Sequence, residues 1–393
     1  MAGPRIHILG AGNIGSLVAT SLAATPGKTC QPLVNLILRS PERVRDYERQ
    51  GGALTIYRTV AGVPVEISRQ IPAVDPNSLV RRYQASLGQS NKNKSKPDNS
   101  TLDNLVVSVK THQTVSALGP LIPAITPSTA ILLLQNGMGS YESLCRTYWP
   151  DPALRPQFYV AITTHGVNSV GAPHQQHLSN FSFTHASPGY ITIARVPSNP
   201  QLAETSDEAL EKQQEEDASR QSPLVKALEH APGLKARYVP YPEFLVTQVD
   251  KLVANAVINP LTALYECYNG ELSALSSLDS LVYGLSRECA DVFCAEYRDI
   301  IPAAELHASF NVARFADLVS SVIKATAENR SSMLQDVLAL RDTEIDDICG
   351  HVVRLGYKHG KGVLHHKMML DLVKSKVSLG RDRAKRSAPI VNI

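Results

Sequence analysis

Short apolar runs alternate with helical stretches through the first half of the chain. The runs with the pattern of buried strands are residues 5–10, 33–39, 104–110, 130–135, 158–166 and 190–195. Helical segments fall between several of these runs, a rhythm that predicts a parallel sheet with crossover helices. From about residue 243 to residue 377 the pattern is helical, without a convincing strand.

This change of pattern predicts two domains. We expect an α/β domain with a mainly parallel sheet over residues 1–242 and an all-α domain over residues 243–393. A length of 393 residues agrees, because a chain of this size usually forms more than one core. Residues 86–100 and 198–222 are polar and poor in apolar side chains, so we interpret them as surface insertions in the first domain.

Composition narrows the class of protein. With 43% hydrophobic residues, 19% charged residues and a net charge of +3, the chain is an ordinary globular protein and not a nucleic-acid binder. The six cysteines have no CxxC spacing, which predicts reduced thiols and no metal site. The strand pattern begins about five residues from the start, and no apolar run reaches about 18 residues. We therefore expect a cytoplasmic protein with no membrane partner.

The segment GAGNIG follows the first predicted strand and precedes a helix. In this context Gly10 permits a tight turn, Gly12 lets backbone approach a pyrophosphate, and Gly15 allows close packing of helix on strand. The backbone of Asn13 and Ile14 would then face the phosphates from the helix N-terminus. The motif predicts a dinucleotide cofactor and hence a Rossmann-type domain.

The end of the second predicted strand bears on which dinucleotide is bound. An NAD enzyme usually has Asp or Glu there, but this chain has Arg39 and Ser40. A guanidinium suits a 2′-phosphate, and a hydroxyl can add a hydrogen bond. This favours NADPH, with a surface arginine as the alternative.

Two further strands are followed by polar residues. Lys110 and Gln113 come after one of them, and Gln135 and Asn136 come after the next. In an open parallel sheet, ligands bind beyond the carboxyl ends of the strands. Each segment alone could be an ordinary turn, but together with GAGNIG they predict one site.

The helical segment KLVANAVIN carries Lys251, Asn255 and Asn259 at intervals of four. On a helix this spacing makes one narrow stripe, and every residue between the three is apolar. Buried Lys and Asn side chains need polar partners, from the protein, from water or from a ligand. The spacing alone leaves a structural or solvated role and a binding site equally open.

Several motifs in this order resemble the ketopantoate reductases (2-dehydropantoate 2-reductases). They are GAGNIG, VKTHQ, QNGMGS, KLVANAVINPLTALYECYNGEL and ENRSSMLQDVLALRDTEIDDICG. The resemblance covers nearly the whole chain apart from the two polar stretches and the C-terminus. It implies NADPH in a cleft between a Rossmann-type domain and a helical domain. It also implies reduction of 2-dehydropantoate to (R)-pantoate in pantothenate and coenzyme A biosynthesis.

The resemblance also implies roles for individual residues. Lys251 would be the general acid and Glu344 its carboxylate partner. The positions that match substrate-binding residues are Asn255, Asn259, Asn329 and Ser332. Lys110 and Asn136 match polar residues near the nicotinamide and the substrate. The chemistry agrees, because a ketone that accepts a hydride develops charge on oxygen that a cationic donor stabilises. Burial would lower the pKa of the lysine, and a nearby carboxylate would raise it.

Alternatives stay open at this point. The same fold could reduce another 2-oxo or 3-oxo acid, or bind NADPH as a regulator without turnover. A homodimer is compatible with the sequence. We assign no role to His185 and treat His365 and His366 as surface residues. We interpret RDRAKR at residues 381–386 as a solvated tail, with a nuclear signal as the alternative. Ser332 could also be only a helix cap.

Overall fold

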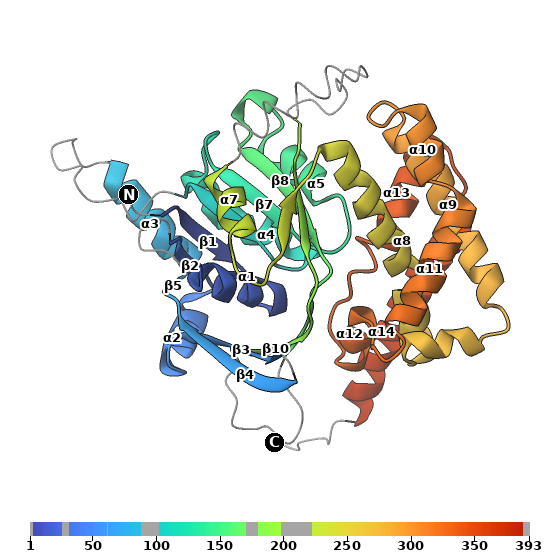
Figure 1. Ribbon diagram of the computed structural model, residues 1–393, viewed down its shortest axis with the longest axis horizontal. Helices are drawn as coiled ribbons and strands as arrows, with labels where there is room; N and C mark the ends of the chain where they lie inside the picture. The colour runs from blue at the N-terminus through green and yellow to red at the C-terminus, as the bar shows by residue number, and fades with distance from the viewer. Residues whose placement is uncertain are drawn as a thin grey trace. The chain divides into compact units, whose positions relative to one another are not determined.

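The described part of the chain divides into two compact units. The computed structural model describes residues 3–25, 31–60, 62–87, 102–169, 180–197 and 222–387. The first unit contains the described residues up to 241 except 136–139, and the second contains residues 136–139 and the chain from Pro242 onward (Figure 1). The predicted insertions at 86–100 and 198–222 lie almost entirely outside the described residues.

An eight-stranded sheet forms the centre of the first unit. Its strands are β1 (Arg5–Leu9), β2 (Leu33–Ile37), β5 (Ala73–Val74), β6 (Asn104–Val107), β7 (Ala130–Leu134), β8 (Gln157–Thr163), β11 (Ile191–Arg195) and β12 (Ala236–Tyr238). Their order is β12-β11-β8-β7-β6-β1-β2-β5, and only the β8–β11 pair is antiparallel. The predicted α/β fold with a mainly parallel sheet is confirmed.

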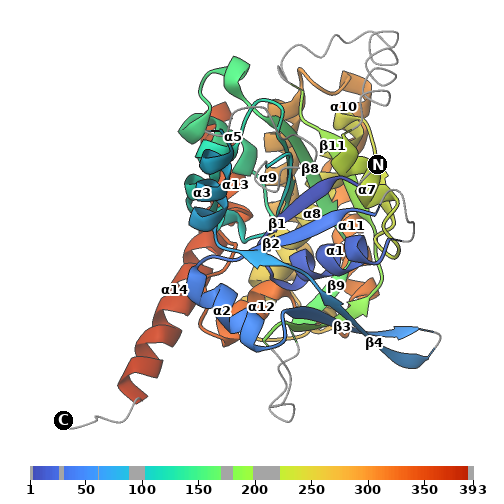
Figure 2. The same cartoon turned by 90° about the vertical axis from the view of Figure 1, so that its left-hand side faces the viewer.

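Helices cover both faces of this sheet. The helices of the first unit are α1 (Asn13–Ala23), α2 (Pro41–Arg49), α3 (Pro76–Leu87), α4 (Thr114–Leu118), α5 (Ser140–Tyr148) and α7 (Pro223–Glu229), with short 3-10 turns η1 (Thr111–Gln113), η2 (Gly119–Ala124) and η3 (Pro152–Leu154). Ile6 and Ile8 pack in a core with α1 and α7, while Leu9 and Leu105 pack in another with α3, α4 and α5 (Figure 2). Burial on both faces explains the continuous apolar runs.

A second sheet in the first unit was not predicted. It consists of β3 (Ala53–Val60), β4 (Val63–Gln70), β9 (Gly166–Ser169) and β10 (Ser182–Ser187), in the order β4-β3-β10-β9. Residues 158–166 were predicted as one strand, but β8 ends at Thr163 and β9 begins at Gly166. The side chains of β4 are mostly exposed, so its sequence lacks the apolar run by which a buried strand is recognised.

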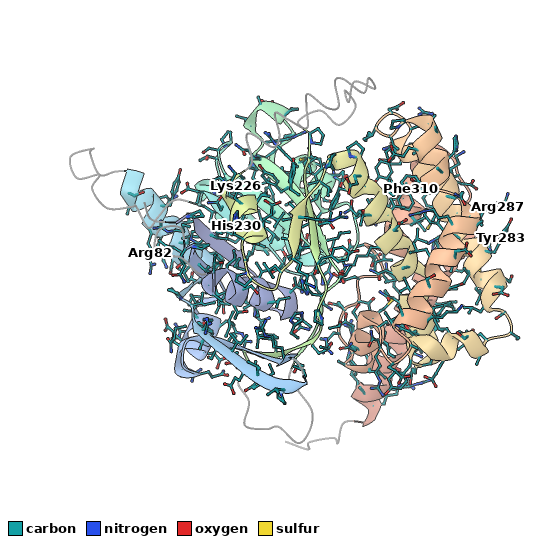
Figure 3. All side chains as sticks on the ribbon, viewed as in Figure 1. Arg82, Lys226, His230, Tyr283, Arg287 and Phe310 are labelled. Atoms are coloured by element: carbon teal, nitrogen blue, oxygen red, sulfur yellow. The ribbon has the colours of Figure 1, made fainter. Side chains whose placement is uncertain are left out.

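The second unit is helical throughout its described residues, as predicted. Its elements are α8 (Tyr241–Tyr265), η5 (Asn269–Ala274), α9 (Leu278–Tyr297), α10 (Ala303–Ser309), α11 (Val312–Ala325), α12 (Ser332–Leu338), α13 (Cys349–His359) and α14 (Leu364–Ser387). Helix α9 packs against α11, α13 and α14. Phe310 lies among the side chains inside this unit, whereas Tyr283 and Arg287 project from the outer side of α9 (Figure 3).

The basic segment at residues 381–386 is helical. It forms the last turns of α14, where Arg381 makes an ion pair of 2.7 Å with Asp342. Its side chains remain mostly exposed, in agreement with the predicted solvation. No helix among the described residues is long and apolar enough to cross a bilayer.

Candidate active site

The glycine motif forms a tight turn between β1 and α1. Gly10 has a φ of +105°, a conformation that favours glycine. A Cβ on Gly15 would lie 2.1 Å from the carbonyl oxygen of Gly10, so only glycine lets α1 start this close to the strand. A Cβ on Gly12, in contrast, would meet no atom within 4 Å. The turn therefore leaves open space at Gly12, beside the N-terminus of α1.

Helix α1 begins without a side-chain cap. Gly12 occupies the N-cap position, and the first turn holds no acidic residue. The backbone N–H groups at this end are therefore available to an anion. The side chain of Asn13 donates a hydrogen bond of 2.8 Å to the carbonyl of Val167, so its amide serves the fold, and Ile14 packs partly against the core.

Arg39 and Ser40 follow β2 directly. The Arg39 side chain is exposed. The Ser40 hydroxyl accepts a hydrogen bond of 3.3 Å from the backbone N–H of Arg43 and thereby caps α2. Ser40 therefore already has a structural role, and Arg39 is the more direct candidate for binding the 2′-phosphate of a dinucleotide.

The polar residues after β6 and β7 lie at the same sheet edge as the glycine turn. Leu9 pairs with Val107, and Val107 pairs with Leu133, so the carboxyl ends of three strands are level. Half-buried Lys110 precedes η1. The Gln135 side-chain amide donates to the carbonyl of Val109 and to the hydroxyl of Thr114, both at 2.6 Å, and ties the two strand ends together.

Asn136 belongs to the second unit, together with residues 137–139. Its side-chain amide donates a hydrogen bond of 3.2 Å to a carboxylate oxygen of Glu344. The backbone N–H of Met138 donates to the carbonyl of Asp347, and a Cβ on Gly137 would lie 2.6 Å from that same carbonyl oxygen. The Asn-Gly pair therefore packs closely on the segment that carries Glu344.

The predicted polar stripe lies on α8. Lys251 and Asn255 are half-buried, Asn259 is buried, and the residues between them are buried. Pro260 cannot donate to the carbonyl of Ala256, and the thiol of Cys349 lies 3.5 Å from that oxygen and supplies a donor. The helix is thus embedded in apolar side chains, which makes the stripe unlike an ordinary solvated face.

Lys251 and Glu344 interact electrostatically within this unit. Burial lowers the pKa of Lys251 from 10.5 to about 8, and the negative charge of Glu344 opposes that decrease. An amine with a pKa near 8 is largely protonated at neutral pH and can also give up its proton readily. This is the electrostatic state required of a proton donor.

The segment before α12 carries the remaining predicted residues. Asn329 and Ser332 are both exposed. Ser331, and not Ser332, caps α12, because its hydroxyl accepts a hydrogen bond of 3.0 Å from Leu334. The hydroxyls of Ser331 and Thr262 lie 2.8 Å apart, which links α12 to α8. Thr262 is not among the predicted site residues, although it lies three residues, close to one helical turn, after Asn259.

The prediction that His365 and His366 are surface residues is right for His365, whose side chain is exposed, and wrong for His366. His366 is fully buried, and both imidazoles and both backbone N–H groups bond the carboxylate of Glu288 at 2.8 to 3.0 Å. Burial alone would raise the pKa of Glu288, but the hydrogen bonds from His366 and His365 lower it to about 2. Glu288 lies on α9, far away in sequence, so no local pattern could reveal this partner.

Another histidine pair lies in the first unit. His165 Nδ1 lies 3.0 Å from His185 Nε2, and the N–H of Gly189 also donates to His165 Nδ1. His165 Nε2 therefore carries the proton of the neutral ring and donates a hydrogen bond of 2.9 Å to the carbonyl of Leu234. Burial lowers the pKa of both histidines. His185 thus has a structural partner that the sequence did not reveal.

No group of three or more His, Cys, Asp or Glu side chains could hold a metal ion in the described ranges. The five cysteines within these ranges are free thiols, and Cys30 lies outside them.

Comparisons with known proteins cover both units. The family described as "Ketopantoate reductase PanE/ApbA" matches residues 6–198, and "Ketopantoate reductase PanE/ApbA C terminal" matches residues 243–377. A Schizosaccharomyces pombe protein named "Probable 2-dehydropantoate 2-reductase" is 35% identical over 380 residues, 96% of this chain and 98% of its own length. The 2-dehydropantoate 2-reductase of Saccharomyces cerevisiae is 30% identical over 89% of this chain and 87% of its own.

A solved structure shares the fold at lower identity. It is a D-mandelate dehydrogenase in a ternary complex with NADH and anilino(oxo)acetate, with a TM-score of 0.66 and 20% identity over 96% of this chain and 99% of that one. At this identity the likeness concerns the fold alone.

Proposed function

Because this chain belongs to the ketopantoate reductase family, we propose that it catalyses the NADPH-dependent reduction of 2-dehydropantoate to (R)-pantoate. The two relatives described above are named as a probable 2-dehydropantoate 2-reductase and a 2-dehydropantoate 2-reductase, and the matches cover 98% and 87% of their lengths. The observation that carries the proposal is Lys251, whose pKa is lowered to about 8 on a buried helix that also presents Asn255 and Asn259. We assign cofactor binding to the first unit and substrate binding to the second.

The residues of the glycine turn fit a dinucleotide. The open space at Gly12 and the uncapped N-terminus of α1 suit a pyrophosphate, which needs close backbone approach and N–H donors. Lys110, at the same sheet edge, adds a cation near the end of β6. Bound there, a nicotinamide cofactor would supply the hydride.

Arg39 supports NADPH over NADH. Its exposed guanidinium follows β2, where NAD enzymes usually carry an acidic residue, and it can pair with a 2′-phosphate. The D-mandelate dehydrogenase of the same fold was solved with NADH, so the fold alone does not decide between the two cofactors.

The residues of the second unit have distinct tasks in this proposal. The ammonium of Lys251 donates a hydrogen bond and then its proton to the carbonyl oxygen of the substrate as negative charge develops there. Glu344 keeps Lys251 protonated, and Asn136 orients the Glu344 carboxylate. Asn255 and Asn259 offer donors and acceptors to the substrate hydroxyl and carboxylate, and Asn329 and Ser332 complete the binding surface.

The test is loss of NADPH absorbance with 2-dehydropantoate in the wild type and in Lys251→Ala. We expect turnover to fall at least about a hundredfold in the variant, because a general acid contributes at least that much. Lys324→Ala, which removes an exposed lysine of α11, serves as the matched control. Wild-type turnover by Lys251→Ala would overturn the proposed role of the lysine.

A second candidate keeps the reaction and changes the oxo acid. The D-mandelate dehydrogenase shares the fold and was solved with anilino(oxo)acetate, so the fold is compatible with other oxo acids. Turnover of a panel of 2-oxo and 3-oxo acids separates the candidates, and NADPH binding without turnover of any of them would favour a regulator. The homodimer and the cytoplasmic location stay predictions.

A further inference from the structure

The segment that carries Glu344 has no buried side chain in the stretch that leads up to it. This segment joins the end of α12 to the start of α13. Residues 338–342 are all exposed, whereas Ile345 and Ile348, which follow Glu344, are buried. A stretch without buried apolar side chains keeps its shape mainly through polar contacts. The position of Glu344 therefore depends on the polar contacts of this exposed stretch.

The chain turns sharply at Leu340, four residues before Glu344. The φ of Leu340 is +55°, in the left-handed region that a residue with a side chain seldom adopts. Such a conformation persists only where the surrounding contacts fix it. Arg341 supplies two of these contacts, because its backbone N–H bonds the carbonyl of Asp336 at 2.8 Å and its Nε bonds the Asp336 carboxylate at 2.9 Å. These bonds tie the turn to α12.

Helix α14, which packs against α12, supplies further contacts to this turn (Figure 1). Arg381 donates a hydrogen bond of 3.1 Å from Nε to the carbonyl of Leu340 and one of 2.7 Å from Nη2 to the carboxylate of Asp342. A Cβ on Gly380 would lie 3.0 Å from Cδ2 of Leu340, so glycine lets the backbone of α14 come close to this side chain. Because glycine weakens a helix interior, its presence here agrees with a packing role. Arg381 thus bonds the turn at two points.

The side of the segment that follows Glu344 is held differently. The buried side chains of Ile345 and Ile348 fix the chain there. An ion pair between Asp346 and Lys374 also lies on this side, but both side chains are about half exposed, and such pairs contribute little. The polar contacts from α14 therefore matter more at the turn before Glu344 than after it.

We propose that Arg381 is a positioning residue for the reaction, which fixes the turn at Leu340 and thereby keeps the Glu344 carboxylate where it acts on Lys251. Arg381 belongs to the basic segment RDRAKR, beyond residue 377, where the match to the family ends. The first residue of this segment thus supports the active site. The inference rests on the proposed function, because it requires Glu344 to keep Lys251 protonated.

The experiment measures kcat and KM for NADPH oxidation with 2-dehydropantoate at about pH 8 in the wild type, Arg381→Gln, Glu344→Gln and the double variant. We expect Arg381→Gln to lower kcat about fivefold with KM within about twofold, because a displaced carboxylate leaves Lys251 less protonated. In the Glu344→Gln background, the same substitution should lower kcat less than about twofold, because the carboxylate through which Arg381 acts is already absent. A merely structural role would lower kcat by the same factor in both backgrounds.

Two further variants of α14 serve as matched controls. Arg381→Lys should recover part of the lost kcat, because an ammonium can still pair with Asp342 but cannot form both bonds of the guanidinium. Arg386→Gln removes an arginine whose partner, Asp382, lies one turn earlier on the same helix, and it should match the wild type.

Amide hydrogen exchange tests the inference without turnover. The backbone N–H groups of Asp347 and Ile348 each donate a hydrogen bond of 3.0 Å to the carbonyl of Glu344, so their protection reports how firmly Glu344 is held. These two amides should exchange faster in Arg381→Gln than in the wild type. Arg386→Gln should leave their exchange unchanged.

The outcomes distinguish this inference from the proposed function. If the wild type reduces 2-dehydropantoate and Arg381→Gln keeps the wild-type kcat, or loses the same factor in both backgrounds, the inference is wrong and the proposed function stands. If the wild type shows no turnover, the proposed function is wrong and hydrogen exchange decides whether Arg381 holds Glu344. Unchanged exchange in Arg381→Gln would then refute the positioning role as well.

Discussion

Replacing Glu344 with Gln should move the basic limb of the pH profile to lower pH. The carboxylate opposes the effect of burial on Lys251, so its removal leaves burial to lower the pKa of the amine further below about 8. The amide of Gln has nearly the same shape, and it can still bond Asn136, which lies 3.2 Å from the present carboxylate oxygen. The substitution therefore removes the negative charge and keeps the shape of the side chain and its hydrogen bond with Asn136.

The magnitude follows from the fraction of Lys251 that is protonated. An opposite charge nearby typically changes a pKa by about 1 to 3 units, and we take about 1 unit for this pair. At about pH 8 the wild-type amine is roughly half protonated, whereas an amine with a pKa of about 7 is roughly one tenth protonated. The variant should therefore lose about fivefold in kcat/KM at this pH beyond any loss at lower pH.

The assay is kcat/KM for NADPH oxidation across the pH range in which the protein stays folded. Asp346→Asn is the matched control, because Asp346 lies in the same segment but pairs with Lys374 at 2.5 Å. The control should keep the wild-type basic limb. A basic limb that stays in place in Glu344→Gln, or that moves to higher pH, would refute the electrostatic coupling between Glu344 and Lys251.

Three further predictions concern the cofactor and stability. Gly12→Ala should fold normally, because the new Cβ meets no protein atom, but it should bind NADPH about tenfold or more weakly in a fluorescence titration, because the Cβ occupies the space proposed for the pyrophosphate. Gly15→Ala should also lower the melting temperature, since its Cβ would lie 2.1 Å from a carbonyl oxygen. Arg39→Gln should weaken NADPH binding by about tenfold or more and leave NADH binding unchanged. An equal loss of affinity for the two cofactors would contradict the proposal that Arg39 binds the 2′-phosphate. Glu288→Gln should lower the free energy of unfolding by roughly 3 kcal/mol at neutral pH. Because the pKa of Glu288 is lowered from 4.5 to about 2, this contribution is present above pH 4.5 and is lost as pH falls toward 2, so denaturant melts of the two proteins should converge in acid.

Local patterns in the sequence determined the elements and the positions of several candidate residues. The apolar runs predicted β1, β2, β6 and β7, because a strand covered on both faces consists mostly of apolar side chains. Spacing by four placed Lys251, Asn255 and Asn259 on one face of a helix, because that distance is nearly one helical turn. GAGNIG predicted a tight turn before a helix, which the structure has at Gly10.

Only the tertiary structure decided which distant side chains meet. The partner of His366 is Glu288, the link from α8 to α12 is Thr262 with Ser331, and the acceptor for Cys349 is the carbonyl that Pro260 leaves without a helical donor. A local pattern records the period of an element and the face it buries. It does not record which element packs beside it, because that depends on the fit of whole helices and sheets. The electrostatic state of Lys251 is decided at this level, by burial and by a carboxylate that lies far away in sequence.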